Sequence, residues 1–262
     1  MARTSTNNKI MLWGAGGVTA VVLALTAYAA VSGGGHDSTE SKRHGGSTAA
    51  PSRPVPTYSV PPDWTEPARW LALPRGKNTT ADGYQTNFPD TADGAVAMLV
   101  AASSTNVEGS QTTVDQQLAI YNTYMSATDK SSVNEEKVRE AAAQTDGQER
   151  GSMGLPTSGP LPSGAFVRTN VVGFKVIQAS PGEVTAYLLT RVAEKAGETA
   201  TEKDSYASGV VGVVWEHGDW KLSGKASDDA LQQTQGQQGP AIAAPGDAAF
   251  NSAGWTAIRQ AS

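Results

Sequence analysis

The chain has 262 residues, of which 39% are hydrophobic and only 6% aromatic, with 28 glycines and 14 prolines. This length and composition predict one folded domain of about 150 to 170 residues with additional segments around it. The absence of cysteine excludes disulfides, thiolate metal ligands, a cysteine nucleophile and the lipid-modified cysteine of a lipoprotein. Any membrane anchor must therefore be the polypeptide itself.

The charge changes sign along the chain. Residues 1–62 carry 5 basic and 2 acidic residues, a balance of +3, whereas residues 63–262 carry 15 basic and 23 acidic residues, a balance of −8. An acidic domain gains nothing from neutralising phosphates. We therefore expect no direct binding of nucleic acid.

Residues 10–32 form an uncharged, mostly apolar run of 23 residues. A helix of that length would measure about 35 Å, enough to cross a hydrocarbon core of about 30 Å. The basic residues of the short segment 1–9, Arg3 and Lys9, favour a cytoplasmic N-terminus and a domain outside the membrane. The alternative is a signal peptide cleaved near Ala29, but the run is longer than a usual signal sequence core, which favours a retained single-pass anchor.

Residues 33–62 are rich in Gly, Ser and Pro and poor in large apolar side chains. Such a segment cannot bury enough surface to offset the entropy of ordering, so it predicts a disordered tether. The folded domain is expected over residues 63–230, and residues 231–262 are expected to be a linker and a partly docked tail anchored by Phe250, Trp255 and Ile258.

The first half of the domain is expected to be helical. Residues 63–74 predict a short helix or a lead-in that packs on the domain, and Ala95, Val96, Leu99 and Ala102 recur at helical spacing. Two later helices each begin with a pattern typical of a capping box, Thr113–Gln116 and Ser132–Glu135. The third helix extends through the alanines 141–143, and the glycines and prolines of 151–164 are expected to prevent any helix.

The second half is rich in β-branched and aromatic residues and predicts at least four strands. Val172, Phe174 and Val176 are expected on one face of the first, and Ser180–Glu183 reads as a turn into the second. In that second strand Thr185, Tyr187, Leu189 and Arg191 alternate with Val184, Ala186, Leu188 and Val192. His217 and Gly218 suit a two-residue hairpin turn. Helices followed by an antiparallel meander predict an α+β fold, with helices packed on one face of a curved sheet of about four strands.

The last hairpin has the form V-x-W-x-x-G-D-W-K-L, carried by Val213, Trp215, Gly218, Asp219, Trp220, Lys221 and Leu222. With the helices before it, this motif resembles the cystatin-like cone fold of the nuclear-transport-factor-two superfamily. The anchor, tether and cysteine-free acidic domain together are similar to the exterior assembly subunits of type IV secretion and conjugation machines. The Ala- and Gly-rich composition also looks like that of actinobacterial proteins.

The resemblance implies that a catalytic relative would use His, Asp or Tyr side chains at the mouth of the cone. The only histidine after residue 62 is His217, which the pattern places at a solvent-exposed turn tip, so no catalytic site is expected there. A carboxylate base such as Asp115 or Asp129 stays open, whereas Glu135–Glu136 and Asp228–Asp229 read as solvated surface. The chain has no spacing typical of a metal site, and we expect neither a metal nor a cofactor.

Trp215 and Trp220 flank the turn on neighbouring strands and are expected to pair across them, which fixes the hairpin register. Together with Tyr187 they are also candidate partner-binding residues, because Trp and Tyr are frequent at binding hot spots. The sequence thus predicts a non-enzymatic, membrane-anchored interaction domain that contacts other envelope or secretion-apparatus subunits, or further copies of itself.

Two alternatives stay open. One is an accessory protein of lipid import with the same layout. The other is a small-molecule-binding cone, which requires a concave face that is open and not filled by Phe174, Tyr187 and Leu189.

Overall fold

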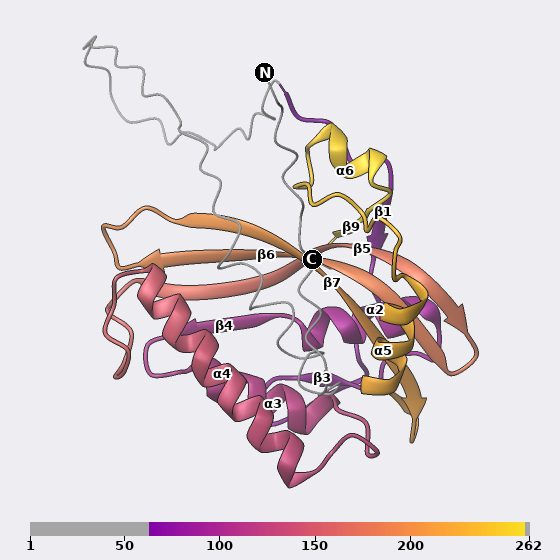
Figure 1. Cartoon of the computed structure of the whole chain (residues 1–262), viewed down its shortest axis with the longest axis horizontal. Helices are drawn as coiled ribbons and strands as arrows, with labels where there is room; N and C mark the ends of the chain where they lie inside the picture. Colours follow the sequence, from indigo (N-terminus) through magenta and orange to yellow (C-terminus); the bar gives the residue numbers. More distant parts are fainter. Residues whose placement is uncertain (1–62, 260–262) are drawn as a thin grey trace, which may run out of the picture.

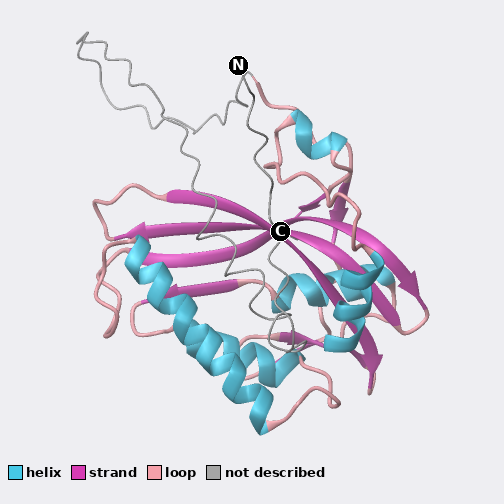
Figure 2. Cartoon of the chain, viewed as in Figure 1, coloured by secondary structure: helices cyan, strands magenta, loops and turns pink. Residues whose placement is uncertain are grey.

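The computed structural model describes residues 63–259 (Figure 1). The predicted cytoplasmic segment 1–9, transmembrane helix 10–32 and tether 33–62 lie outside the described residues. Within residues 63–259, no helix is both long and apolar enough to span a bilayer. The described part is an α+β fold in which helices lie on both faces of one large, curved sheet (Figure 2).

The sheet is built around the predicted antiparallel meander. Four strands follow one another in sequence and in space: β5 (Ala165–Ser180), β6 (Glu183–Ala196), β7 (Lys203–Glu216) and β8 (Asp219–Leu222). Three more complete it, so the sheet has seven strands and not four: β1 (Trp70–Ala72), β4 (Thr105–Glu108) and β9 (Thr256–Arg259). β4 and β9 pair in turn with the outer edge of β5, and β1 pairs parallel to β9. The short β2 (Asn78–Thr79) and β3 (Gln85–Thr86) form a separate ribbon.

The alternation predicted for β6 is confirmed, but that of β5 is not. Val184, Ala186 and Leu188 face one core, while Tyr187 and Leu189 face another. In β5 the register shifts between Val171 and Gly173, which places Val172 on the face opposite to Phe174. A bulge adds one residue to one strand, so the alternation of side chains between the two faces is reversed beyond the bulge. The alternating pattern of the sequence alone does not reveal where a bulge occurs.

Helix α2 (Ala92–Ala102) is the centre of the larger core, as its predicted spacing indicated. Ala95, Met98 and Leu99 are fully buried, and the hydroxyl of Thr91 caps the helix by accepting from the amide of Gly94 at 3.0 Å. A Cβ at Gly94 would lie 2.0 Å from the carbonyl oxygen of Pro89. Only glycine therefore allows the chain to approach the start of α2 so closely.

The N-cap residues of helices α3 (Thr113–Tyr124) and α4 (Ser132–Ser152) each lie one residue before the predicted one. The capping box of α3 joins Thr112 and Asp115, and Ser131 caps α4. In each case the chain holds two adjacent hydroxyl residues, and only the first has the extended backbone of a cap. Helix α4 also continues to Ser152, past the glycine at which the sequence predicted a break.

The two faces of the sheet carry separate cores. We call the face that packs on α2 and α3 the helical face, with α4 lying against α3, and the opposite face the tail face (Figure 1). The tail face is covered by α5 (Gly224–Gln233), α6 (Ala248–Ser252) and the segment between them. The expected boundary at residue 230 falls inside α5. Residues 63–74, expected as a short helix or a lead-in that packs on the domain, contain the strand β1 and no helix.

The C-terminal segment packs on the sheet through two large side chains. Phe250 and Trp255 are buried on the tail face beside Leu189, and the indole of Trp255 donates to the carbonyl of Ala241 at 2.8 Å. Because β9 then joins the sheet, the tail is part of the domain. Helices therefore lie on both faces of the sheet, whereas the sequence predicted them on one face.

Candidate functional site

The β7–β8 hairpin places its two tryptophans against each other. Trp215 and Trp220 are directly opposite in the register, with ring centroids 5.3 Å apart in an edge-to-face arrangement. Trp220 is only 1% exposed, and its indole N–H donates to the carbonyl of Pro89 at 2.8 Å. The predicted cross-strand pair is confirmed, and it also ties the hairpin to the start of α2.

The three candidate partner-binding residues do not form one surface. Trp220 is buried in the core and offers no area to a partner, which removes it from the candidates. Trp215 is half-buried on the helical face, whereas Tyr187 is half-buried on the tail face, close to Gly239. A single partner patch that uses all three is therefore excluded by the burial and the strand alternation.

His217 lies at the tip of the hairpin, as predicted. Its side chain is 86% exposed, and both turn residues have positive φ, 52° for His217 and 80° for Gly218. Two consecutive positive φ angles are typical of the tight type I′ hairpin turn. The imidazole lies 3.5 Å from the carboxylate of Glu216.

Replacing His217 with asparagine is expected to change the free energy of unfolding by less than about 0.5 kcal/mol, because asparagine tolerates the left-handed region. Replacing it with valine is expected to cost about 1 kcal/mol or more, since a β-branched residue is strained there. Urea unfolding of both variants checks this. Equal stability of the two variants would contradict a turn role for His217.

The carboxylates considered as bases have structural partners. Asp115 accepts from the amide of Thr112 in the capping box, and Asp129 accepts from the hydroxyl of Ser126 at 2.7 Å and the amide of Gly224 at 2.9 Å. Both therefore hold loops and helix ends together. Among residues 63–259, no three His, Asp or Glu side chains are grouped so as to hold a metal ion.

A polar cluster lies where α3 and α4 meet β6. The carboxylate of Glu149 accepts from the hydroxyl of Thr113 at 2.9 Å, and the neighbouring Ser152 donates to Glu194 on β6 at 2.8 Å. Burial raises the pKa of Glu149 to about 7; the Thr113 hydroxyl lowers it, the carboxylates of Glu194 and Asp146 raise it, and Arg150 lowers it. Glu149 thus titrates near neutral pH, a property that no sequence pattern indicated.

The interior of the helical face is filled by side chains. Phe174 is 6% exposed and packs with Leu188 and Val211 among the core residues. Tyr187 and Leu189, which with Phe174 were named as the side chains that could fill the concavity of a ligand-binding cone, lie on the tail face because they alternate with Leu188. Of the three side chains named for that test, only Phe174 lies in the core of the helical face.

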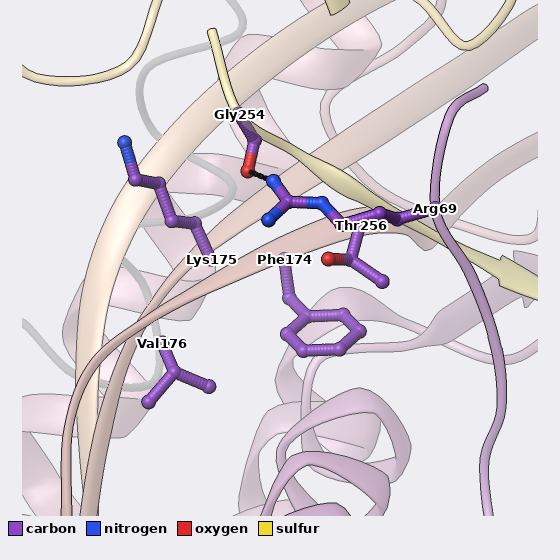
Figure 3. Close-up of a pocket in the computed structure, with 6 residues that line it drawn as sticks. All are labelled: Arg69, Phe174, Lys175, Val176, Gly254 and Thr256. Atoms are coloured by element: carbon purple, nitrogen blue, oxygen red, sulfur yellow. Dashed lines mark hydrogen bonds between the residues drawn. The ribbon is translucent and has the colours of Figure 1, made fainter. Parts of the chain in front are cut away.

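A pocket of about 480 Å³ opens where β1, β5 and β9 meet (Figure 3). Its lining combines two cations, Arg69 and Lys175, with the apolar Phe174 and Val176, and it is completed by Gly254 and Thr256. Of these residues, the sequence analysis singled out only Phe174 and Val176, as apolar residues of a predicted strand. Lys175 lies between them on β5, but Arg69, Gly254 and Thr256 come from segments that long-range strand pairing brings to β5, so no local signal could have joined them.

The comparisons with known proteins gave one match. No curated protein and no solved structure matched the chain. A family model described as a domain of unknown function, DUF8175, matches residues 35–242, which is more than half of the chain. The chain therefore belongs to the DUF8175 family.

Proposed function

We propose that the chain is a non-enzymatic, membrane-anchored interaction domain outside the membrane, and that it serves as a structural or assembly component of a conjugation-type secretion apparatus. The sequence layout supports this: an apolar run, a tether, and then an acidic, cysteine-free domain. The observation that carries the proposal is an open strand edge on β7.

The outer edge of β7 is free along most of its length. β8 covers only Val213–Glu216, and just before it Gly212 points its backbone away from β6, because its carbonyl accepts from Ser223 and its amide donates to Ser227. The backbone N–H and C=O groups of every second residue in a strand point to the same side, and the register between β6 and β7 has no shift that would change this. The backbone groups of the even-numbered residues 204–210 therefore point outward, and no hydrogen bond within the described residues reaches them.

On the other side of the sheet, the short edge strand β4 is blocked at its second residue by a side chain. On β4, the amide of Asn106 donates to the side-chain oxygen of Gln116 at 2.8 Å, and the side-chain nitrogen of Gln116 donates back to the carbonyl of Asn106. Proteins generally cover or block their strand edges, because an open edge is a template for another strand. The contrast between the blocked β4 and the open part of β7 supports strand addition at β7 as the means by which a partner binds.

The filled interior also favours a scaffold. The helical face is packed with apolar side chains around Phe174 and Leu188, and His217 lies in solvent at the hairpin tip. A rigid, well-packed sheet holds its edge strand in place, so a partner strand does not have to order it on binding.

Replacing Ser208 with proline tests the edge. Proline removes an outward amide that has no partner within the described residues, and it is tolerated on strand edges, so we expect the fold to persist while a partner strand is lost. In a host cell that lacks the chromosomal copy, we expect the full-length variant to restore conjugative DNA transfer at least tenfold less well than the wild type. The readout is transfer frequency at matched membrane levels.

The matched control is Ser208→Thr, which keeps the amide and is expected to restore transfer fully. Normal transfer in the deletion strain would refute the conjugation assignment. Wild-type transfer by the proline variant, with transfer lost in the deletion strain, would refute only the use of the β7 edge.

A further inference from the structure

The pocket between β1, β5 and β9 holds two cations that form no ion pair within residues 63–259. Arg69 donates to the carbonyls of Gly254 and Trp255, and Lys175 donates to the carbonyl of Ala253 at 3.3 Å, all at the C-terminal end of α6. In residues 63–259 neither cation lies within ion-pair distance of a carboxylate, although the domain carries an excess of acidic residues. Figure 3 shows the Arg69 guanidinium between Gly254 and the ring of Phe174.

These cations keep donors for a further acceptor. A guanidinium has five N–H donors and an ammonium three, and the carbonyls at the end of α6 use only some of them. Both cations lie beside Gly254, because a Cβ there would be 3.4 Å from the Lys175 nitrogen and 3.5 Å from an Arg69 nitrogen. The pocket thus has the charge to accept an anion.

The other side of the pocket is apolar. Val176 is 38% exposed, which is unusual for a valine within a strand of this sheet, and it lies next to Phe174 (Figure 3). A volume of about 480 Å³ lies within the range of small-ligand sites. A ligand that fits must therefore join an anionic group to an apolar one.

The direction of the strands determines which end of an added peptide strand would reach the pocket. β9 pairs with β5 antiparallel, and its first residue, Thr256, is opposite Phe174. β5 continues to Ser180, and the outer edge of residues 175–180 has no paired strand within the described residues. A strand added to that edge in the same direction as β9 would end just before Thr256, beside Lys175. Its C-terminal carboxylate would then lie beside Arg69 and Lys175.

We propose that this pocket binds the C-terminal carboxylate of an extended polypeptide whose last side chain is apolar, with the preceding residues added as a strand along residues 175–180. The carboxylate bonds Arg69 and Lys175, and the last side chain packs on Phe174 and Val176. This site is separate from the β7 edge, so it stands or falls independently of the proposed function.

The test is calorimetric titration of the full chain, in a nonionic detergent at low salt, with the acetylated tetrapeptide Ala-Val-Thr-Leu. We expect the free acid to bind at least tenfold more tightly than the C-terminal amide. Lys175→Gln removes one cation and Val176→Asp places a like charge in the pocket; each is expected to weaken the acid at least tenfold. Lys137→Gln, an exposed lysine on α4, is the matched control and is expected to leave the affinity unchanged.

Equal affinity for acid and amide, or no binding of either at millimolar peptide, would overturn the proposal. So would octanoate binding as tightly as the peptide acid, because the strand contacts would then contribute nothing. The melting temperatures of Lys175→Gln and Val176→Asp, compared with that of the wild type, show whether a variant that fails to bind is still folded.

Discussion

Replacing Trp220 with alanine is expected to lower the free energy of unfolding by about 3 to 5 kcal/mol. The indole is 1% exposed, packs edge-to-face on Trp215 and donates to the carbonyl of Pro89. The variant loses the burial of a large ring and one of the two hydrogen bonds that the Pro89 carbonyl accepts, the other coming from the amide of Thr91. Urea unfolding, followed by circular dichroism, measures the loss.

Trp215 provides the matched control. It belongs to the same pair but is half-buried, so Trp215→Ala is expected to cost only about 1 kcal/mol. A cost for Trp215→Ala equal to or larger than that for Trp220→Ala would contradict the placement of Trp220 as the anchor between the hairpin and α2. A stable Trp215 variant that no longer supports DNA transfer would instead point to a partner contact at that ring.

The meander could be predicted from the sequence because its signals are local. His217 and Gly218 supply the positive φ angles of one turn, and Gly182, with φ of 80°, supplies that of another. Alternating apolar residues in β6 then fix which face each side chain takes. The same holds for the start of α2, where the spacing of buried residues is that of a helix.

The rest of the sheet depends on contacts that are distant in sequence. β1 pairs with β9, with Trp70 opposite Ala257, although almost the whole sequence of the domain lies between the two strands. Neither strand has more than four residues. Strands that short carry too little periodicity to be predicted. The pocket lined by Arg69 and Lys175 is made by this pairing, so it was missed together with the strands that build it.

The cluster around Glu149 shows a different limit of sequence analysis. Helical spacing places Thr113 and Glu149 on α3 and α4, but only the packing of those helices makes the two side chains meet. Burial there is the largest cause of the raised pKa of Glu149. A lone glutamate near the end of a polar helix would otherwise read as solvated surface.

Replacing Glu149 with glutamine is expected to stabilise the protein at pH 8 by about 2 to 3 kcal/mol and to have almost no effect near pH 4.5. Folding raises the pKa of this carboxyl from 4.5 to about 7, so between those values the folded state binds more protons than the unfolded state. The wild type therefore loses stability as the pH rises through this window, up to about 3 kcal/mol for a shift of this size. Glutamine cannot ionise, yet its amide oxygen still accepts from Thr113.

Thermal unfolding of the full chain in a nonionic detergent at pH 4.5 and pH 8 measures the difference. Glu140→Gln changes an exposed glutamate of the same helix and is expected to shift the two melting temperatures equally, if at all. A gain from Glu149→Gln that is as large at pH 4.5 as at pH 8 would mean that the substitution acts through packing. Ionisation of the buried carboxyl would then not be what makes α4 less stable at neutral pH.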